Sequence, residues 1–247
     1  MLFDVLMPLG RTNNGFAESP CTEAEALAMM DRFGVGEALV FHTLARDSNP
    51  DAGNAALSDL ASPRLHRIWA FDPTWVVPRR PAAFLAEALT AGAKAILVNP
   101  GMRNIRLSRS GRLLELAALL EARRIPLLAV CRRYDQREDA LDWYDLAELC
   151  RKFPRLPVIA WQWRSRANRP LFDALAEAAN LRVALTTLWQ AQMFECLCEA
   201  YGAGRVVFSL GLPELDPASF AGILTYADVK PEVRDAVGGG TVRTLLQ

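Results

Sequence analysis

Histidine is the side chain best suited to proton transfer near neutral pH, because its ordinary pKa is about 6.5. It occurs at only two of the 247 positions, His42 and His66. His42 directly follows the apolar run Ala38–Phe41, whereas His66 precedes the apolar run Ile68–Phe71. Catalytic groups in strand–helix repeats follow the strands, so we take His42 as the candidate acid or base. The alternative is a structural histidine that orients the loop after this run.

Two further reactive groups stand at the ends of apolar runs. Asp72, in the segment Phe71–Thr74, can serve as a general base or as the partner of an arginine. An aspartate before proline also commonly starts a turn by accepting backbone N–H groups. Cys131 precedes two consecutive arginines, whose charges favour a nucleophilic thiolate; a buried inert thiol is the alternative.

Side chains that can hold a negatively charged ligand follow several apolar runs. The planar guanidinium of arginine pairs with carboxylate or phosphate, and amide and aromatic groups can complete such a pocket. The candidates for ligand binding are Arg11, Arg46, Asn99, Arg132, Trp163 and Arg164. Together they predict a site for a small anionic molecule. The alternatives are solvated surface arginines and a tryptophan packed in the core.

Eight short apolar runs at a steady spacing are the elements that must position these groups. They are Leu2–Met7, Ala38–Phe41, Ile68–Phe71, Ala93–Val98, Pro126–Val130, Pro157–Trp161, Leu181–Leu185 and Val206–Leu210. Such runs are typical of parallel strands buried on both faces, and segments with helical periodicity separate them. The alternation predicts an α/β fold, a single (β/α)8 TIM barrel over residues 1–247. The alternative is an open doubly wound sheet, although no G-x-G-x-x-G follows any run.

Helix boundaries in the sequence agree with this alternation. Thr22 and Glu25 predict a capped helix start, and Pro81 suits a first helical position. Gly92 and Gly202 follow periodic segments, where a helix commonly ends in the left-handed conformation.

The composition restricts the classes of partner and compartment. Lys plus Arg number 28 and Asp plus Glu number 28, so nothing in the charge favours nucleic acid or an anionic membrane. Five cysteines without a C-x-x-C pattern indicate reduced thiols. Because we find neither a signal peptide nor an apolar run of about 18 residues, we expect a cytoplasmic protein without a membrane span. A homodimer is the default expectation for a soluble protein.

Several segments resemble the motifs of one known superfamily. Phe3–Gly10 is similar to an opening D-x-H-x-H-x-G strand, and Met30–Val40 to a first helix that turns into a second strand. Gly92–Pro100 is similar to G-x-K-x-I-x-x-x-P, and Arg205–Pro213 to R-x-x-F-G-S-D-x-P. In this order the segments resemble the amidohydrolase superfamily, in the branch that includes small-acid decarboxylases and lactone hydrolases.

The resemblance implies a metal-dependent hydrolase or decarboxylase, but the residues that would bind the metal differ in this chain. The ligand positions fall on Leu6, Pro8, Val130 or Cys131, Trp161 or Gln162, and Gly211. A catalytic zinc needs about three protein ligands, and these residue types do not supply them. We therefore predict a degenerate member with no metal site and no cofactor.

The expected function is a non-hydrolytic barrel, a pseudoenzyme, that binds a small anionic organic ligand at the C-terminal face. The alternative is a metal-independent hydrolase, lactonase or decarboxylase that acts on a small carboxylate. In that alternative His42 or Asp72 handles protons, and Arg46, Arg132 or Arg164 holds the anion.

Overall fold

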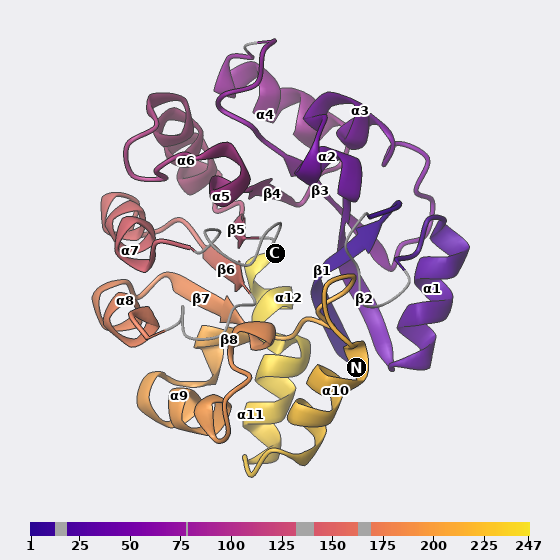
Figure 1. The fold of residues 1–247 in the computed structure, drawn as a ribbon, viewed down its shortest axis with the longest axis vertical. Coiled ribbons are helices and arrows are strands. Elements are labelled where there is room, and N and C mark those ends of the chain that lie inside the picture. The colour runs from indigo at the N-terminus through magenta and orange to yellow at the C-terminus, as the bar shows by residue number, and fades with distance from the viewer. Residues whose placement is uncertain (13–18, 78, 132–140, 163–168) are drawn as a thin grey trace.

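Eight parallel strands, hydrogen-bonded in sequence order, form the centre of the molecule in a computed structural model (Figure 1). The model describes residues 1–12, 19–77, 79–131, 141–162 and 169–247. The strands are β1 (Leu2–Leu9), β2 (Val35–His42), β3 (Leu65–Ala70), β4 (Ala95–Val98), β5 (Leu127–Cys131), β6 (Val158–Gln162), β7 (Leu181–Ala184) and β8 (Val206–Val207). The amide of Val5 on β1 donates to the Phe208 carbonyl just after β8 at 3.1 Å, which brings the first and last strands together. The predicted barrel is confirmed, and the consecutive strand order excludes a doubly wound sheet.

Helices surround the strands on the outside of this barrel (Figure 1). They are α1 (Glu23–Arg32), α2 (Thr43–Asp47), α3 (Pro50–Ala55), α4 (Pro81–Thr90), α5 (Pro100–Arg103), α6 (Gly111–Arg123), α7 (Trp143–Lys152), α8 (Leu171–Glu177), α9 (Met193–Tyr201), α10 (Pro217–Tyr226), α11 (Pro231–Asp235) and α12 (Thr241–Leu245). The Thr22 hydroxyl and the Glu25 side chain form the predicted capping box of α1. Gly92 and Gly202 adopt φ values of +80° and +88°, as expected after the ends of α4 and α9.

The apolar side chains divide into an inner and an outer core. The inner core combines alternate residues from facing strands, such as Leu39 on β2, Leu97 on β4 and Trp161 on β6. Only the interior of a closed barrel brings such positions into contact. The outer core fills the space between the strands and the surrounding helices and includes Cys131.

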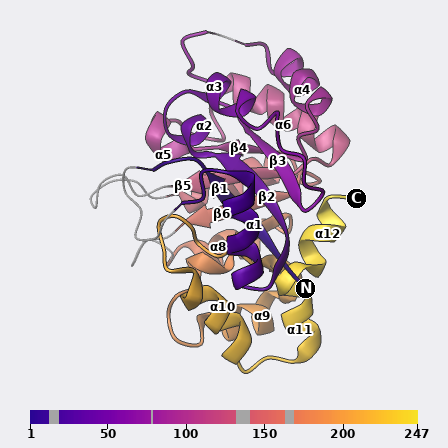
Figure 2. The same cartoon turned by 90° about the vertical axis from the view of Figure 1, so that its right-hand side faces the viewer.

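The two ends of the barrel are structurally different. The strands finish at the C-terminal face, where α5 follows β4, whereas α12 lies at the opposite end (Figure 2). Val242 of α12 packs into the inner core and so covers the N-terminal end of the barrel. In the described part of the chain, every helix is too short or too polar to cross a bilayer.

Candidate functional site

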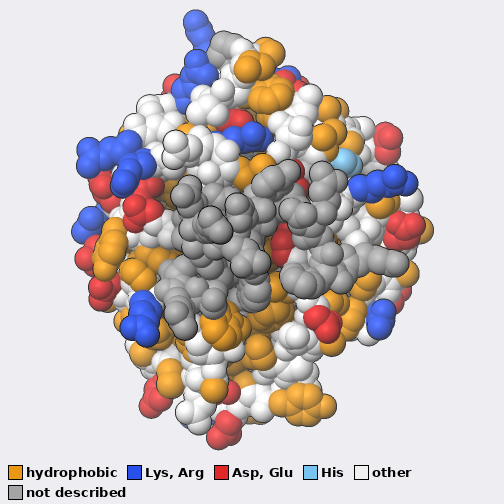
Figure 3. All heavy atoms as spheres, viewed as in Figure 1, with side chains coloured by type: hydrophobic (Ala, Val, Ile, Leu, Met, Phe, Trp, Pro, Cys, Tyr) orange, Lys and Arg blue, Asp and Glu red, His pale blue; other side chains and the backbone are white. Residues whose placement is uncertain are grey.

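Buried polar side chains collect at the C-terminal face of the barrel. Arg46, Asn99, Gln162, Thr186, Thr187, Ser209 and Glu214 all lie at or soon after the ends of strands and are at most 6% exposed. Figure 3 views the molecule from this face and shows charged side chains of both signs around its edge. Because buried polar atoms are normally hydrogen-bonded, such a concentration marks a site with a specific purpose.

Arg46 on α2 is the central cation of this face. It is 1% exposed, and its guanidinium carbon lies 4.8 Å from the centre of the Phe41 ring. Its Nη2 is 2.7 Å from Glu214 Oε1, and its Nε is 2.7 Å from Asp47 Oδ1. Burial alone would lower the pKa of Arg46, but the two carboxylates raise it above its ordinary value. The side chain is therefore a fixed, permanently charged group at the mouth of the barrel.

Several donors at this face have no acceptor within the described residues. They are Arg46 Nη1 after β2, Asn99 Nδ2 after β4, Gln162 Nε2 at the end of β6 and the Thr186 hydroxyl after β7. Asn99 directly follows β4, and Thr186 lies in the short 3-10 turn Leu185–Thr187 that follows β7. A buried donor without an acceptor costs about 1–3 kcal/mol. An acceptor-rich ligand would satisfy such donors.

Asp72 lies beside Arg103, the last residue of α5. Its Oδ2 is 2.9 Å from Arg103 Nε, while its Oδ1 accepts from the Thr74 amide at 2.8 Å and the Thr74 hydroxyl at 2.7 Å. The structure thus shows both of the non-catalytic contacts considered for Asp72, the turn and the arginine partner. Both carboxylate oxygens of Asp72 are therefore occupied by donors.

His42 is the N-cap residue of α2. Its Nδ1 accepts from the Leu44 amide at 3.2 Å, so the neutral ring carries its proton on Nε2. Partial burial lowers the pKa of His42, which keeps the ring neutral at pH 7. Gly10, with φ +103°, lies so close that an added Cβ would be 2.8 Å from the His42 ring. The ring is therefore held tightly between the end of β1 and the start of α2.

Inside the barrel, Ser209 lies beside both Trp161 and Asp4, and neither residue was predicted as a polar contact. The Trp161 indole donates to the Ser209 hydroxyl at 3.2 Å, which links the ends of β6 and β8. Asp4 on β1 is fully buried, and its Oδ1 accepts from the Leu6 amide at 3.0 Å. Burial raises the pKa of Asp4 to about 6, although Leu6, Ser209 and Leu210 favour the charged form. The available signal was one acid inside the otherwise apolar run Leu2–Met7.

The remaining sequence candidates lie apart from this buried group or outside the described residues. The Arg11 side chain is exposed, and only its backbone carbonyl joins the face, accepting from the Thr43 hydroxyl at 2.8 Å. Arg132, Trp163 and Arg164 are outside the residues that the structure describes. Cys131 is 1% exposed and packs in the outer core, toward the helices.

The positions that the resemblance assigns to metal ligands are buried among apolar groups. Leu6 and Trp161 both pack in the inner core. Gly211 has φ +83°, and an added Cβ would be 2.9 Å from Leu215. Among the described residues, no three His, Cys, Asp or Glu side chains lie close enough together to hold a metal ion.

Comparisons with known proteins agree with the fold. No family model matches the chain, and no curated protein matches it. An uncharacterized TIM-barrel protein, Bb4693 from Bordetella bronchiseptica, has a TM-score of 0.75 at 15% identity, covering 99% of this chain and 98% of that one. A dihydroxybenzoic acid decarboxylase from Polaromonas sp. JS666, solved with bound manganese, has a TM-score of 0.73 at 13% identity, covering 99% and 96%. Amidohydrolase 2 from Bifidobacterium longum subsp. infantis has a TM-score of 0.66 at 13% identity, covering 99% and 98%. The chain therefore has the TIM-barrel fold of solved amidohydrolase and decarboxylase structures.

Proposed function

We propose that this chain binds a small organic carboxylate at the C-terminal face of its barrel and does so without a divalent metal. The observation that carries the proposal is the buried Arg46 guanidinium, whose Nη1 has no acceptor among the described residues. At the same face, Asn99 Nδ2 and the Thr186 hydroxyl have no acceptor among the residues that the structure describes. A carboxylate accepts several hydrogen bonds at once and is the natural complement of an arginine fork.

The segment that follows β6 adds positive charge, whereas the three arginines in the segment that follows β5 are balanced by Asp135, Glu138 and Asp139. The two segments include Arg132, Arg133, Arg164 and Arg166, which lie outside the described residues. Arg46 itself is compensated by Glu214 and Asp47. We therefore assign it the role of orienting a ligand, and we assign the neutralisation of the ligand's charge to Arg132 and Arg164. Trp163 would contribute an aromatic wall.

The residues present do not fit the metal that the resemblance implies. The decarboxylase from Polaromonas contains manganese. In this chain Leu6, Trp161 and Gly211 stand at three of the implied ligand positions, where they pack against neighbouring side chains. Hydrocarbon and indole groups offer no lone pair suited to a divalent cation. We derive no reaction step through a metal.

Binding without hydrolysis is favoured over catalysis because both candidate proton carriers are committed to structural contacts. His42 caps α2 through Nδ1, and Asp72 is held by Arg103 and Thr74. The second candidate is a metal-independent decarboxylase, lactonase or hydrolase of a small carboxylate. It would use His42, whose lowered pKa favours the neutral ring, but Nδ1 could take a proton only by releasing the Leu44 amide.

A thermal-shift titration with benzoate and 2,6-dihydroxybenzoate tests the proposal, because a ligand of the native state raises Tm. We expect a concentration-dependent rise in Tm that is reduced in Asn99→Ala and in Thr186→Val. Thr225→Val is the matched control, because the Thr225 hydroxyl bonds only within α10. Release of CO2 from 2,6-dihydroxybenzoate would favour the enzymatic candidate. Equal shifts in Thr186→Val and Thr225→Val, or no shift with either acid, would contradict the proposed site.

A further inference from the structure

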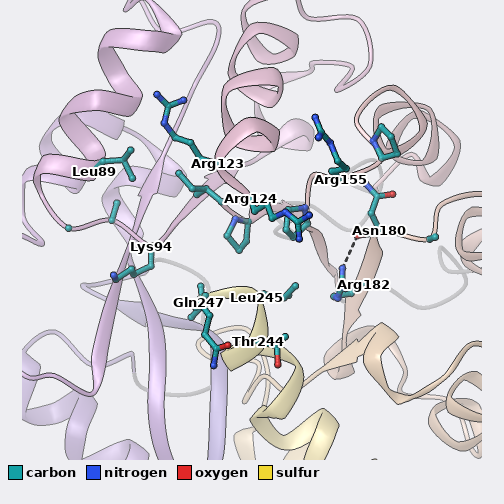
Figure 4. A pocket seen from close by; sticks show the side chains of 18 residues that line it. Leu89, Lys94, Arg123, Arg124, Arg155, Asn180, Arg182, Thr244, Leu245 and Gln247 are labelled. Carbon is teal, nitrogen blue, oxygen red and sulfur yellow. Dashed lines mark hydrogen bonds between the residues drawn. The ribbon is translucent and has the colours of Figure 1, made fainter.

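A cavity opens at the N-terminal face of the barrel, opposite the candidate site. We call it the basal cavity; its lining includes Lys94, Arg124, Arg155, Arg182 and the segment 244–247 (Figure 4). Lys94, Arg124 and Arg155 come just before β4, β5 and β6, respectively. Arg182 lies on β7, and the segment 244–247 contains the end of α12. The cavity has a volume of about 830 Å³, which lies within the roughly 300–1,000 Å³ of small-molecule sites.

The charged side chains that line the basal cavity are of one sign. Five cationic side chains line it, including Arg123, and the described residues that line it include no Asp or Glu. Within the described part of the chain, none of the five cations forms an ion pair, although Arg123 and Arg182 each donate to a backbone carbonyl. Five unneutralised cations around one hollow attract anions and repel one another.

Arg182 is the most constrained of these cations. It lies on β7 in the inward register of Ala184, and its Nη1 donates to the Asn180 carbonyl at 3.1 Å (Figure 4). Its Nε is buried and has no acceptor among the described residues. Burial and the nearby positive charge of Arg205 both lower the pKa of Arg182. A bound anion would relieve this repulsion and satisfy the free donor.

The walls of the basal cavity are not polar throughout. Leu89, Ile125, Pro126 and Leu245 contribute apolar surface beside the cations. This combination suits a ligand with an anionic end and an organic body. Guanidinium groups bind phosphate oxygens in pairs, and lysine binds them as a point charge.

We propose that the basal cavity binds an organic di- or polyphosphate of nucleotide size, held by Lys94, Arg124 and Arg182. Arg155, which lies on the same side of the cavity as Arg182, would add to the field that attracts the phosphates. The organic body would lie against Ile125, Pro126 and Leu245. This ligand is independent of the carboxylate proposed for the other end of the barrel.

Isothermal titration calorimetry with ADP, pyrophosphate and adenosine tests the assignment on the full chain. We expect ADP and pyrophosphate to bind, adenosine not to bind, and affinity to fall as NaCl is raised, because salt screens exposed charges. Arg124→Gln and Lys94→Gln should each weaken ADP binding by about tenfold to a hundredfold, the usual effect of losing a charge-assisted bond. Arg182→Gln should also weaken ADP binding. It should leave Tm unchanged or higher, because it removes a partly buried charge that the nearby charge of Arg205 repels.

Arg109→Gln is the control for a loss of positive charge alone. Arg109 is exposed, lies just before α6 near the C-terminal face, and does not line the cavity. The Arg109→Gln variant should leave ADP binding unchanged. In the unsubstituted protein, excess benzoate should not displace ADP. No binding of ADP or pyrophosphate at low salt would overturn the assignment. So would equal weakening by Arg109→Gln and Arg124→Gln.

Discussion

Asp4 is the residue whose environment departs most from its ordinary one. It is a fully buried carboxyl with one oxygen bonded to the Leu6 amide and the other without a bond of ordinary geometry in the described part of the chain. Its position on β1, near Ser209, places an ionisable group within the barrel wall. Burying such a group costs free energy whenever it is charged.

Asp4→Asn should therefore stabilise the protein in a pH-dependent way. The pKa of Asp4 is raised from 3.8 to about 6, so this group destabilises the fold progressively as pH rises through that interval and fully above it. We expect the variant to gain up to about 3 kcal/mol in free energy of unfolding at about pH 8, at 1.36 kcal/mol per pKa unit, and almost nothing at about pH 4. Urea denaturation of both proteins across this range measures the difference.

Asp59→Asn, at an exposed aspartate, is the matched control and should show no such pH-dependent gain. A gain of equal size at both ends of the pH range would mean that the charge of Asp4 is not its cause.

Trp161 gives a second prediction at this scale. Trp161→Phe removes the indole N–H that the Ser209 hydroxyl accepts and leaves unfilled space in the inner core. We expect a loss of about 1–3 kcal/mol in unfolding free energy from the missing bond and contacts. The exposed Trp189→Phe should cost little by comparison. Chemical denaturation that ranks the two variants in the reverse order would contradict this account of Trp161.

At the scale of elements, the short helices after β2 and β4 position the candidate site. α2 carries Arg46, and the Asn99 side chain caps α5, with its Oδ1 accepting from the Met102 amide at 3.4 Å. Arg103 ends α5 and reaches the Ser48 carbonyl after α2 at 3.4 Å. This hydrogen bond connects the two helices. Because Arg46 lies on α2, a change at the N-cap of α2 should move its guanidinium.

A pair of His42 variants separates capping from catalysis. His42→Ala should lose about 1 kcal/mol of stability, because the Leu44 amide loses its acceptor. His42→Asn presents an acceptor near the position of Nδ1 and should recover most of that stability and the Tm shift with benzoate. Thermal denaturation with and without benzoate measures both effects. If Asn restores stability but not the response to benzoate, then the ring of His42 itself contributes to the site.

At the scale of the whole molecule, the barrel presents two faces of different chemistry. The C-terminal face carries cations compensated by carboxylates, as Arg46 is by Glu214. The basal cavity carries cations, and its described lining includes no Asp or Glu side chain. The formal net charge of zero therefore hides a local excess of positive charge, which the composition alone does not reveal.

The proposed absence of a metal site predicts the behaviour of the intact protein toward chelators. We expect dialysis against EDTA to leave Tm unchanged, because Leu6, Trp161 and Gly211 supply no ligand through which a bound metal could stabilise the fold. Added manganese or zinc should not raise Tm. Elemental analysis that finds either metal in stoichiometric amount after dialysis would refute the proposal.

The order and type of the elements followed from the sequence because their signals are local. An apolar run, the Thr22 capping box and Gly92 each depend only on residues a few positions away in the chain. Because functional groups of such barrels lie at the C-terminal ends of the strands, the strand positions then indicated the face on which the candidates lie. The bounds of the strands were predicted less exactly; β2, for example, covers Val35–His42 where Ala38–Phe41 was predicted. Val206–Leu210 was predicted, but β8 ends at Val207, since Phe208 donates to the Val237 carbonyl.

The partners within the site were decided only by the tertiary structure. Arg46 and Glu214 are 168 residues apart, and Trp161 and Ser209 are 48 apart. Such pairs exist only once the barrel closes and strands distant in the chain become neighbours. The sequence by itself determined which side chains follow each strand. Closure of the barrel decided which of these side chains have a charged partner and which keep a donor without an acceptor. It also decided which cations surround the basal cavity. These properties depend on distances in space rather than along the chain.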